Sequence, residues 1–254
     1  MPITRRTGLT LAAAAIGTPF LPRLSGAQDR GRLTWPIEGG EVVFHPVEHA
    51  SLAIETPGGV IYVDPVGGGG KYAGLPEPAL ILITHEHGDH FDLPTLEALP
   101  PVRLISNPAV HDKLPEAMKT RASAMANGEA VEVLGMTLEA VPAHNTTEDR
   151  MQYHPVGRDN GYVLTIGGQR FYVAGDTEPT PEMLGLSDVA LAFLPMNLPY
   201  TMTVEQAAEA VAAFRPAAVV PYHHRGSDIQ EFARLVGEGG SGSEVIIAAW
   251  YPGG

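Results

Sequence analysis

The chain has 254 residues, of which 44% are hydrophobic, and its 16 Lys and Arg against 29 Asp and Glu give a formal net charge of −13. The length and composition suit a globular enzyme, and the acidic balance excludes a nucleic-acid binder, whose affinity depends on basic residues. Because the chain has no cysteine, disulfides, thiolate metal ligands and a cysteine nucleophile are excluded as well.

The first 27 residues have the pattern of an export signal. Arg5 and Arg6 precede the apolar run 9–17, and the small residues at 25–27 offer a cleavage site. The pattern resembles a twin-arginine signal, so we expect a mature domain at 28–254 that is periplasmic or exported. A bilayer span needs roughly 20 apolar residues, so no stable membrane span is expected once the signal is cleaved. An uncleaved anchor and an ordinary basic N-terminus are the alternatives.

Strands dominate the sequence after a polar lead-in at 28–40, where no element is expected. Runs rich in β-branched and aromatic residues predict strands, and Thr56-Pro57-Gly58-Gly59 predicts a hairpin turn. The continuous apolar run 79–83 has the length of a strand that is buried on both faces. The other predicted strands lie at 41–44, 52–55, 60–63, 131–134, 137–141, 162–166, 171–173 and 189–194.

Two helices are predicted near the C-terminal end of the chain. Thr203 and Gln206 form a capping box before apolar residues at helical spacing, and Asp228 and Glu231 repeat that design. No linker is long enough to divide the chain after the signal, so we expect one domain. Strands before helices in two successive halves favour two packed sheets with helices outside, and a general α+β fold is equally compatible.

The motif His85-Glu86-His87-Gly88-Asp89-His90 directly follows the buried run 79–83. His85 and His87 can bind one cation through ring nitrogens, while Asp89 and His90 can reach a neighbouring cation. Three of the chain's ten histidines at one strand end favour a metal site over a solvated polar loop. The motif resembles the His-x-His-x-Asp-His signature of the metallo-β-lactamase superfamily. That resemblance implies an α+β fold, the four-layer αβ/βα sandwich.

The resemblance also implies further ligands, each placed just after a strand. His144, Asp176 and His223 stand at such positions. Asp64, after the run 60–63, resembles the acidic residue that accepts the second N–H of a ligating ring. Two divalent metal ions are expected, with zinc as the default and manganese or iron as alternatives. In this assignment His85, His87 and His144 bind the first metal, Asp89, His90 and His223 bind the second, and Asp176 bridges the two.

Other polar residues near these motifs have two interpretations. His224 is the alternative to His223, because only one of two adjacent histidines is expected to point inward. His49 and His154 are candidates for substrate binding, with a structural role as the alternative for each. Arg225 follows a predicted ligand loop, where an arginine can clamp a carboxylate or a phosphate; an ordinary surface arginine is the alternative and the commoner case.

The expected ligand set indicates a hydrolase that acts on a small molecule. Two cations would lower the pKa of a shared water, giving a metal-bound hydroxide that attacks a carboxylic ester, a lactone or a phosphoester. Asp89 can serve as a catalytic residue by passing a proton to the leaving group. Gly175-Asp176-Thr177 and the segment 221–226 resemble the ascorbate-phosphate-lactonase-like branch of the superfamily. An exported metal-binding protein without turnover and a β-lactamase are the alternatives.

Overall fold

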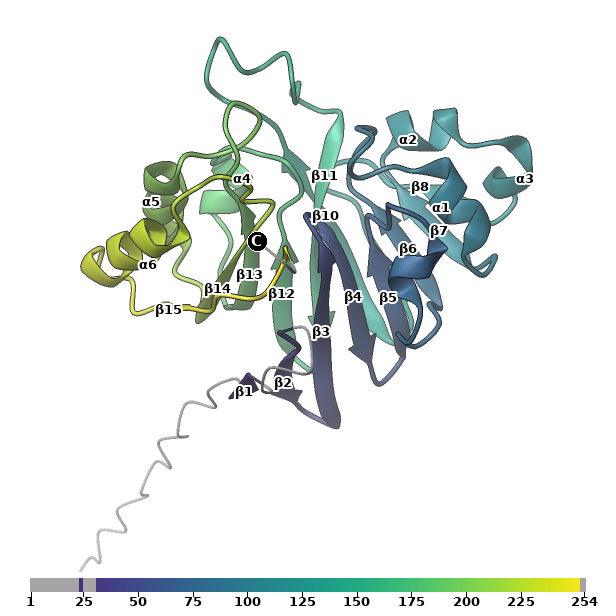
Figure 1. The fold of residues 1–254 in the computed structure, drawn as a ribbon, viewed down its shortest axis with the longest axis horizontal. Coiled ribbons are helices and arrows are strands. Elements are labelled where there is room, and N and C mark those ends of the chain that lie inside the picture. Colours follow the sequence, from purple (N-terminus) through teal and green to yellow (C-terminus); the bar gives the residue numbers. More distant parts are fainter. Residues whose placement is uncertain (1–22, 25–30, 252–254) are drawn as a thin grey trace, which may run out of the picture.

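The structure is a computed structural model that describes residues 23–24 and 31–251. Two mixed sheets face each other, and helices cover their outer sides (Figure 1). This arrangement confirms the predicted α+β fold with four layers in the order αβ/βα. The predicted signal at 1–27 lies outside the described residues, apart from Arg23 and Leu24.

The first sheet contains eight described strands in chain order. Neighbours pair antiparallel from β1 to β5 and parallel from β5 to β8. All four residues of β6 are buried, as its continuous apolar sequence predicts. The strands are β1 (Arg23–Leu24), β2 (Leu33–Ile37), β3 (Gly40–Glu48), β4 (Ser51–Thr56), β5 (Gly59–Val63), β6 (Leu80–Ile83), β7 (Arg103–Ser106) and β8 (Ala122–Ala124).

The second sheet contains seven described strands in the order β15-β14-β13-β12-β11-β10-β9. Its chain-order neighbours pair antiparallel up to β12 and parallel beyond it, so the second half repeats the plan of the first. The strands are β9 (Ala130–Val133), β10 (Met136–Ala143), β11 (Asp159–Ile166), β12 (Gln169–Val173), β13 (Val189–Pro195), β14 (Ala218–Tyr222) and β15 (Glu244–Val245).

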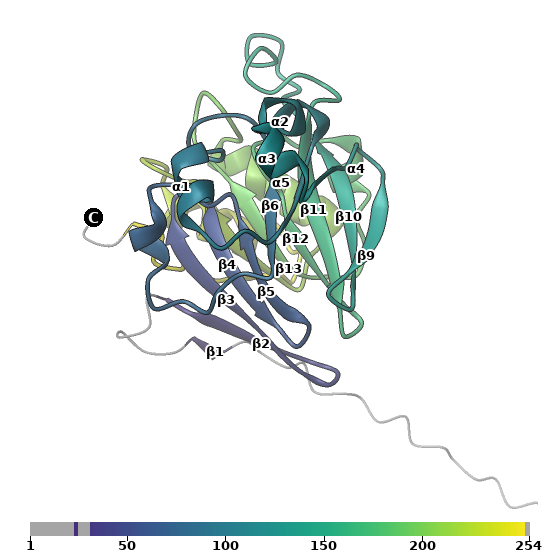
Figure 2. The ribbon, with the colours of Figure 1, turned by 90° about the vertical axis from the view of Figure 1, so that its right-hand side faces the viewer.

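The helices pack on the outer faces of the two sheets. Helices α1 to α3 cover the first sheet and α4 to α6 the second (Figures 1 and 2). The predicted capping box of α5 is present, and the Asp228 side chain caps α6. The helices are η1 (Gly69–Tyr72), α1 (Leu93–Ala98), α2 (Pro108–Lys113), α3 (Glu116–Lys119), α4 (Pro181–Leu184), α5 (Val204–Phe214) and α6 (Ile229–Glu238). None of the helices in the described part of the chain has the length and apolarity that crossing a bilayer requires.

Apolar side chains from both sheets meet in the space between them. The ring centroid of Phe44 in the first sheet lies 5.3 Å from that of Phe171 and 5.2 Å from that of Phe193, both in the second. Trp250 joins this core from the C-terminal segment, with its ring centroid 6.2 Å from that of Phe193. The core therefore fixes the relative position of the two sheets. The loops at their shared edge are held in place as a result.

One expectation about the N-terminal part of the mature chain is wrong. The predicted polar lead-in at 28–40 contains β2, which pairs with β3 and buries Leu33 and Trp35. The sequence around these two side chains is rich in polar residues and glycines, so its composition does not predict a strand. Pairing with β3 and burial against the second sheet stabilise the strand instead.

Candidate metal centre

Histidine and aspartate side chains converge where the loops of the two sheets meet. In the described part of the chain, three groups bring their nitrogen and oxygen atoms within 4.8 Å of one another. Asp176 joins the groups, because its carboxylate lies 3.3 Å from His90 Nε2, 3.5 Å from His154 Nε2 and 3.3 Å from His223 Nε2. The groups are His85, His87 and His154; His85, His90 and Asp176; and His49, Asp89 and His223.

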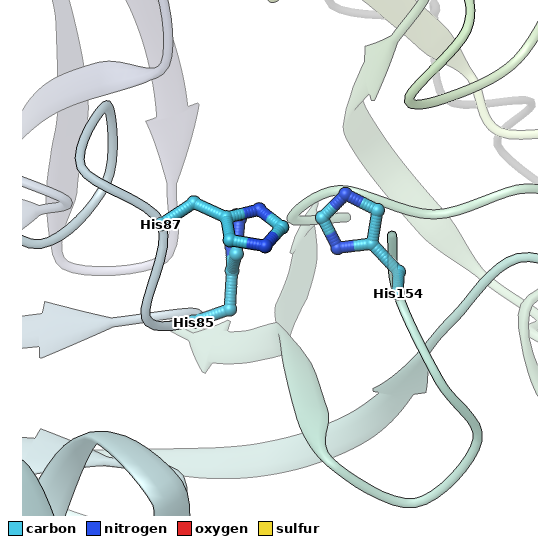
Figure 3. A group of neighbouring side chains, drawn as sticks. All are labelled: His85, His87 and His154. Atoms are coloured by element: carbon cyan, nitrogen blue, oxygen red, sulfur yellow. The ribbon is translucent and has the colours of Figure 1, made fainter. Parts of the chain in front are cut away.

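Two separate loops supply the first group. His85 and His87 lie on the loop after β6, and His85 Nε2 is 3.1 Å from His87 Nδ1. His154 lies on the loop between β10 and β11 and faces them from the opposite side (Figure 3). The centre therefore depends on the docking of one half of the fold against the other.

Hydrogen bonds at Nδ1 orient the rings of the buried histidines His85 and His154. Nδ1 of His85 lies 3.0 Å from Thr84 Oγ1, and Nδ1 of His154 lies 3.1 Å from Asp159 Oδ2. Because Thr84 Oγ1 donates its proton to Asp64, it accepts from His85. The Nε2 atoms of these rings are then left with lone pairs that face the centre, which is the arrangement of ligating histidines.

The buried side chain of Asp64 stabilises the loop after β6 through hydrogen bonds. Its carboxylate accepts hydrogen bonds from the Thr84 backbone N–H at 2.7 Å and from the Thr84 hydroxyl at 2.6 Å. The same carboxylate lies 2.7 Å from His90 Nδ1, which is the contact that its predicted role requires. Asp64 has a φ of 46°, an uncommon conformation for a residue with a side chain, and its side chain is buried.

Gly175 allows the chain to turn sharply after β12 and present Asp176. Its φ is +66°, and a Cβ atom there would lie 2.8 Å from Asn160 O and 3.2 Å from Thr84 Cβ. Only glycine fits such a position without displacing its neighbours. The Asp176 carboxylate consequently lies buried among the histidines, with 3% of its surface exposed.

Several buried atoms of the centre suit a metal ion. His90 Nε2, His154 Nε2, Asp176 Oδ1 and His223 Nε2 have no hydrogen-bond partner among residues 31–251. A buried polar atom without a partner costs about 1–3 kcal/mol, so four of them at one point need an explanation. Imidazole nitrogens and carboxylate oxygens are ligands that zinc, manganese and iron accept, so the donor set fits a divalent metal.

The electrostatics of the centre favour the metal-binding forms of His85, His87 and Asp176 but not that of His90. Burial, and then the charge on His90, lower the pKa of His85 well below its ordinary value, and burial with His154 lowers the pKa of His87. Burial opposes ionisation of Asp176, but His223 and His90 hold its pKa well below the ordinary value. Burial likewise disfavours charge on His90, but Asp176 and Asp64 raise its pKa well above the ordinary value, so ligation there must displace a proton.

His144 lies in none of the three groups found among the described residues. Its Nδ1 is 3.1 Å from the carbonyl oxygen of Asn145, and its backbone bonds to Thr177 and Glu178. His154 lies beside His85 and His87 instead, although the sequence indicated only substrate binding or a structural role for it. Asp159, five residues further on, holds the ring of His154 in the fold, but a His and an Asp at that spacing form no motif that could have identified this histidine from the sequence.

The two histidines after β14 lie in different surroundings. His223 lies in the group with Asp89, whereas the His224 ring packs edge-on against Tyr251 with centroids 5.0 Å apart. The Arg225 guanidinium lies 5.7 Å from the centroid of the Tyr251 ring and borders a hollow of about 340 Å³, which Leu198 also lines. Arg225 therefore contacts Tyr251 and borders this hollow, and it belongs to none of the three groups found among the described residues.

A buried carboxylate anchors the loop that carries His154. Glu178 Oε2 accepts hydrogen bonds from the backbone N–H groups of Thr146 and Thr147, both at 2.6 Å. Glu178 Oε1 accepts from Gln206 Nε2 at 3.2 Å and pairs with Arg150. Burial opposes ionisation of Glu178, but the hydrogen bonds from Thr147 and its neighbours lower its pKa below the ordinary value. The carboxylate thus ties this loop to the start of α5.

The sequence matches a family model and curated proteins. Residues 61–224 match the model described as "Beta-lactamase superfamily domain". A protein of Pyrococcus horikoshii named UPF0173 metal-dependent hydrolase is 32% identical over 216 residues, which cover 78% of this chain and 92% of the relative. A protein of Thermococcus onnurineus with the same name is 32% identical over 201 residues, 74% of this chain and 88% of the relative.

Solved structures agree with this match. A Parabacteroides distasonis protein, named as a proposed metal-dependent hydrolase, has a TM-score of 0.79 and 40% identity, covering 87% of this chain and 99% of its own. Igni18 of Ignicoccus hospitalis, described as a metallo hydrolase, has a TM-score of 0.68 at 24% identity and covers 81% of this chain and 94% of its own. Because its identity is below 25%, the similarity to Igni18 supports the shared fold and nothing further.

Proposed function

The chain belongs to the metallo-β-lactamase superfamily and to its UPF0173 metal-dependent hydrolase family, and from this premise we propose that it hydrolyses a small molecule with two divalent metal ions. Curated relatives are named metal-dependent hydrolases, and the chain is an enzyme of that class. The proposal of two metals rests on one observation, the convergence of buried imidazole and carboxylate atoms without hydrogen-bond partners among the described residues.

The proposed ligands follow the three groups. His85, His87 and His154 would hold one metal, and Asp89, His90 and His223 the other, with Asp176 between them. His154 takes the place first expected of His144, because its Nε2 faces Asp176 at 3.5 Å. Zinc is the proposed metal, since imidazole and carboxylate are its common ligands.

The residues around these ligands would prepare the centre for hydrolysis. Two metals bound there would acidify a water molecule and polarise the bond that it attacks. Asp64 and Asp159 fix the rings of His90 and His154, which keeps the reacting groups in place. The side chain of Asp89 is 50% exposed, so it can carry a proton between the centre and the leaving group.

The proposed substrate is a carboxylic ester, a lactone or a phosphoester. Arg225 follows His223 and His224 in the chain, and an arginine there can contact an anionic part of such a molecule. The resemblance of 175–177 and 221–226 to the ascorbate-phosphate-lactonase-like branch supports this choice. The arginine pair at 5–6 supports export to the periplasm by a twin-arginine signal.

Turnover on a panel of lactones, phosphodiesters and a chromogenic β-lactam tests the proposal. We expect hydrolysis of a lactone or a phosphodiester that stops after chelation, returns with zinc and is absent in His87→Ala and His154→Ala. The His144→Ala variant is the matched control and should retain turnover. Bound metal without turnover on any substrate would favour a metal-binding protein, and turnover of the β-lactam alone would favour a β-lactamase.

A further inference from the structure

Three segments that are far apart in the sequence meet at one side of the metal centre. His49 lies in the tight turn between β3 and β4, His223 follows β14, and Tyr251 lies in the C-terminal segment after β15. That segment returns across the molecule to the strands at its middle (Figure 1). Trp250 fixes it by packing in the core against Tyr222, with ring centroids 5.6 Å apart.

Direct contacts join these segments. The His223 backbone N–H donates to the carbonyl oxygen of His49 at 3.0 Å, and the His224 N–H donates to the Tyr251 hydroxyl oxygen at 3.2 Å. The Tyr251 hydroxyl lies 2.7 Å from His49 Nδ1, and His49 Nε2 lies 3.3 Å from Asp89 Oδ2. The His49 ring is therefore held at Nδ1 and faces Asp89 with Nε2.

Three other rings in the centre have the same arrangement. His85 has Thr84, His90 has Asp64 and His154 has Asp159 at Nδ1, and each presents Nε2 to the centre. When His49 Nδ1–H donates to the Tyr251 oxygen, the Nε2 lone pair is free to ligate in the same way.

A simple pairing of His49 with Asp89 explains less of the geometry. Among the described residues it leaves His223 Nε2 without a hydrogen-bond partner, although that atom is buried 3.5 Å from the same Asp89 oxygen. A cation between the three side chains would satisfy all of them, and their ligand atoms lie within 4.8 Å of one another.

We propose that His49 is a further ligand of the metal held by Asp89 and His223, with its ring oriented by Tyr251. The inference rests on the proposed function, because it requires that the centre binds metal. It assigns the C-terminal segment a role in metal binding, since Tyr251 reaches the centre only through the folding of that segment into the core.

Metal content and metal affinity of the full chain test this inference. We would measure bound zinc by mass spectrometry of the element and zinc affinity by competition with a chromophoric chelator. The His49→Gly variant removes the ring without straining the backbone, because the φ of His49 is 53°. Tyr251→Phe removes only the hydroxyl, and His111→Ala is the control with a histidine outside the centre.

The expected result is a selective loss of affinity at one of the two zinc sites, the one that contains Asp89 and His223. His49→Gly should bind that zinc at least about 100-fold more weakly and Tyr251→Phe about 10-fold, while His111→Ala matches the wild type. Unchanged zinc affinity in both His49→Gly and Tyr251→Phe, with zinc still bound to the wild type, would overturn the role of His49 and leave the proposed function intact. A wild type that binds no zinc would overturn both. Far-ultraviolet circular dichroism checks that each variant is folded.

Discussion

Replacing Glu178 with glutamine should destabilise the fold and loosen the loop that carries His154. Oε2 of Glu178 accepts two backbone N–H groups, from Thr146 and Thr147, while Oε1 faces Gln206 and Arg150. Glutamine has the same shape but turns one oxygen into an N–H donor. Whichever oxygen is replaced, at least two donors lose their acceptor in a buried place.

The size of the loss follows from these contacts. Each buried donor without an acceptor costs about 1–3 kcal/mol, and breaking a buried ion pair costs about 3–5 kcal/mol. We expect Glu178→Gln to lower the free energy of unfolding by about 3 kcal/mol at neutral pH. For a domain of this size that corresponds to a fall in Tm of roughly 6–12 °C.

The pH dependence gives an independent check. The folded pKa of Glu178 lies below its ordinary value of 4.5, so the carboxylate stabilises the fold above that pH, and the contribution is lost as the pH falls through the folded pKa. The stability difference between the wild type and Glu178→Gln should therefore narrow below about pH 4.5.

Urea unfolding followed by circular dichroism, repeated across pH, measures both effects. Glu182→Gln, which changes an exposed carboxylate four residues away, is the matched control and should have little effect. A loss below about 1 kcal/mol for Glu178→Gln, or a difference that stays constant down to acid pH, would refute the reasoning.

Three further changes give distinct outcomes. Asp64→Asn should weaken zinc binding about 10–100-fold, measured by chelator competition, because it removes the acceptor of His90 Nδ1; equal affinity would contradict this. Gly175→Ala should lower the free energy of unfolding more than Gly226→Ala does. Both glycines have a positive φ, but only a Cβ at 175 would meet a backbone atom, Asn160 O. Equal losses of stability in urea unfolding would contradict this. Removing metal with a chelator should lower Tm, and added zinc should restore it, because a ligand of the folded state alone stabilises it; a Tm that does not respond would contradict it.

Much of the fold could be predicted from local sequence. The predicted strands correspond to β3, β4, β5, β6 and their counterparts in the second half, and both predicted helices begin at their predicted caps, Thr203 and Asp228. These elements have strong local signals, either continuous apolar runs or paired capping residues. The short helices α1 to α4 have weaker signals, because four to six residues contain too few turns for a periodic face.

The candidate centre was only partly visible in the sequence. The His85 to His90 motif identified one loop, because its ligands are neighbours in the chain. His154 and His49 are isolated histidines whose partners, His87 and His223, belong to other loops. Tertiary folding alone brings them together, and no local pattern distinguishes them from His144, which follows a strand but lies outside the three groups among the described residues.

Metal stoichiometry of the purified protein tests the central claim most directly. Elemental mass spectrometry should find about two divalent ions per chain in the wild type and fewer in the His154→Ala variant, with the His144→Ala variant equal to the wild type. A wild-type protein that holds no metal, even after equilibration with zinc, would contradict the account.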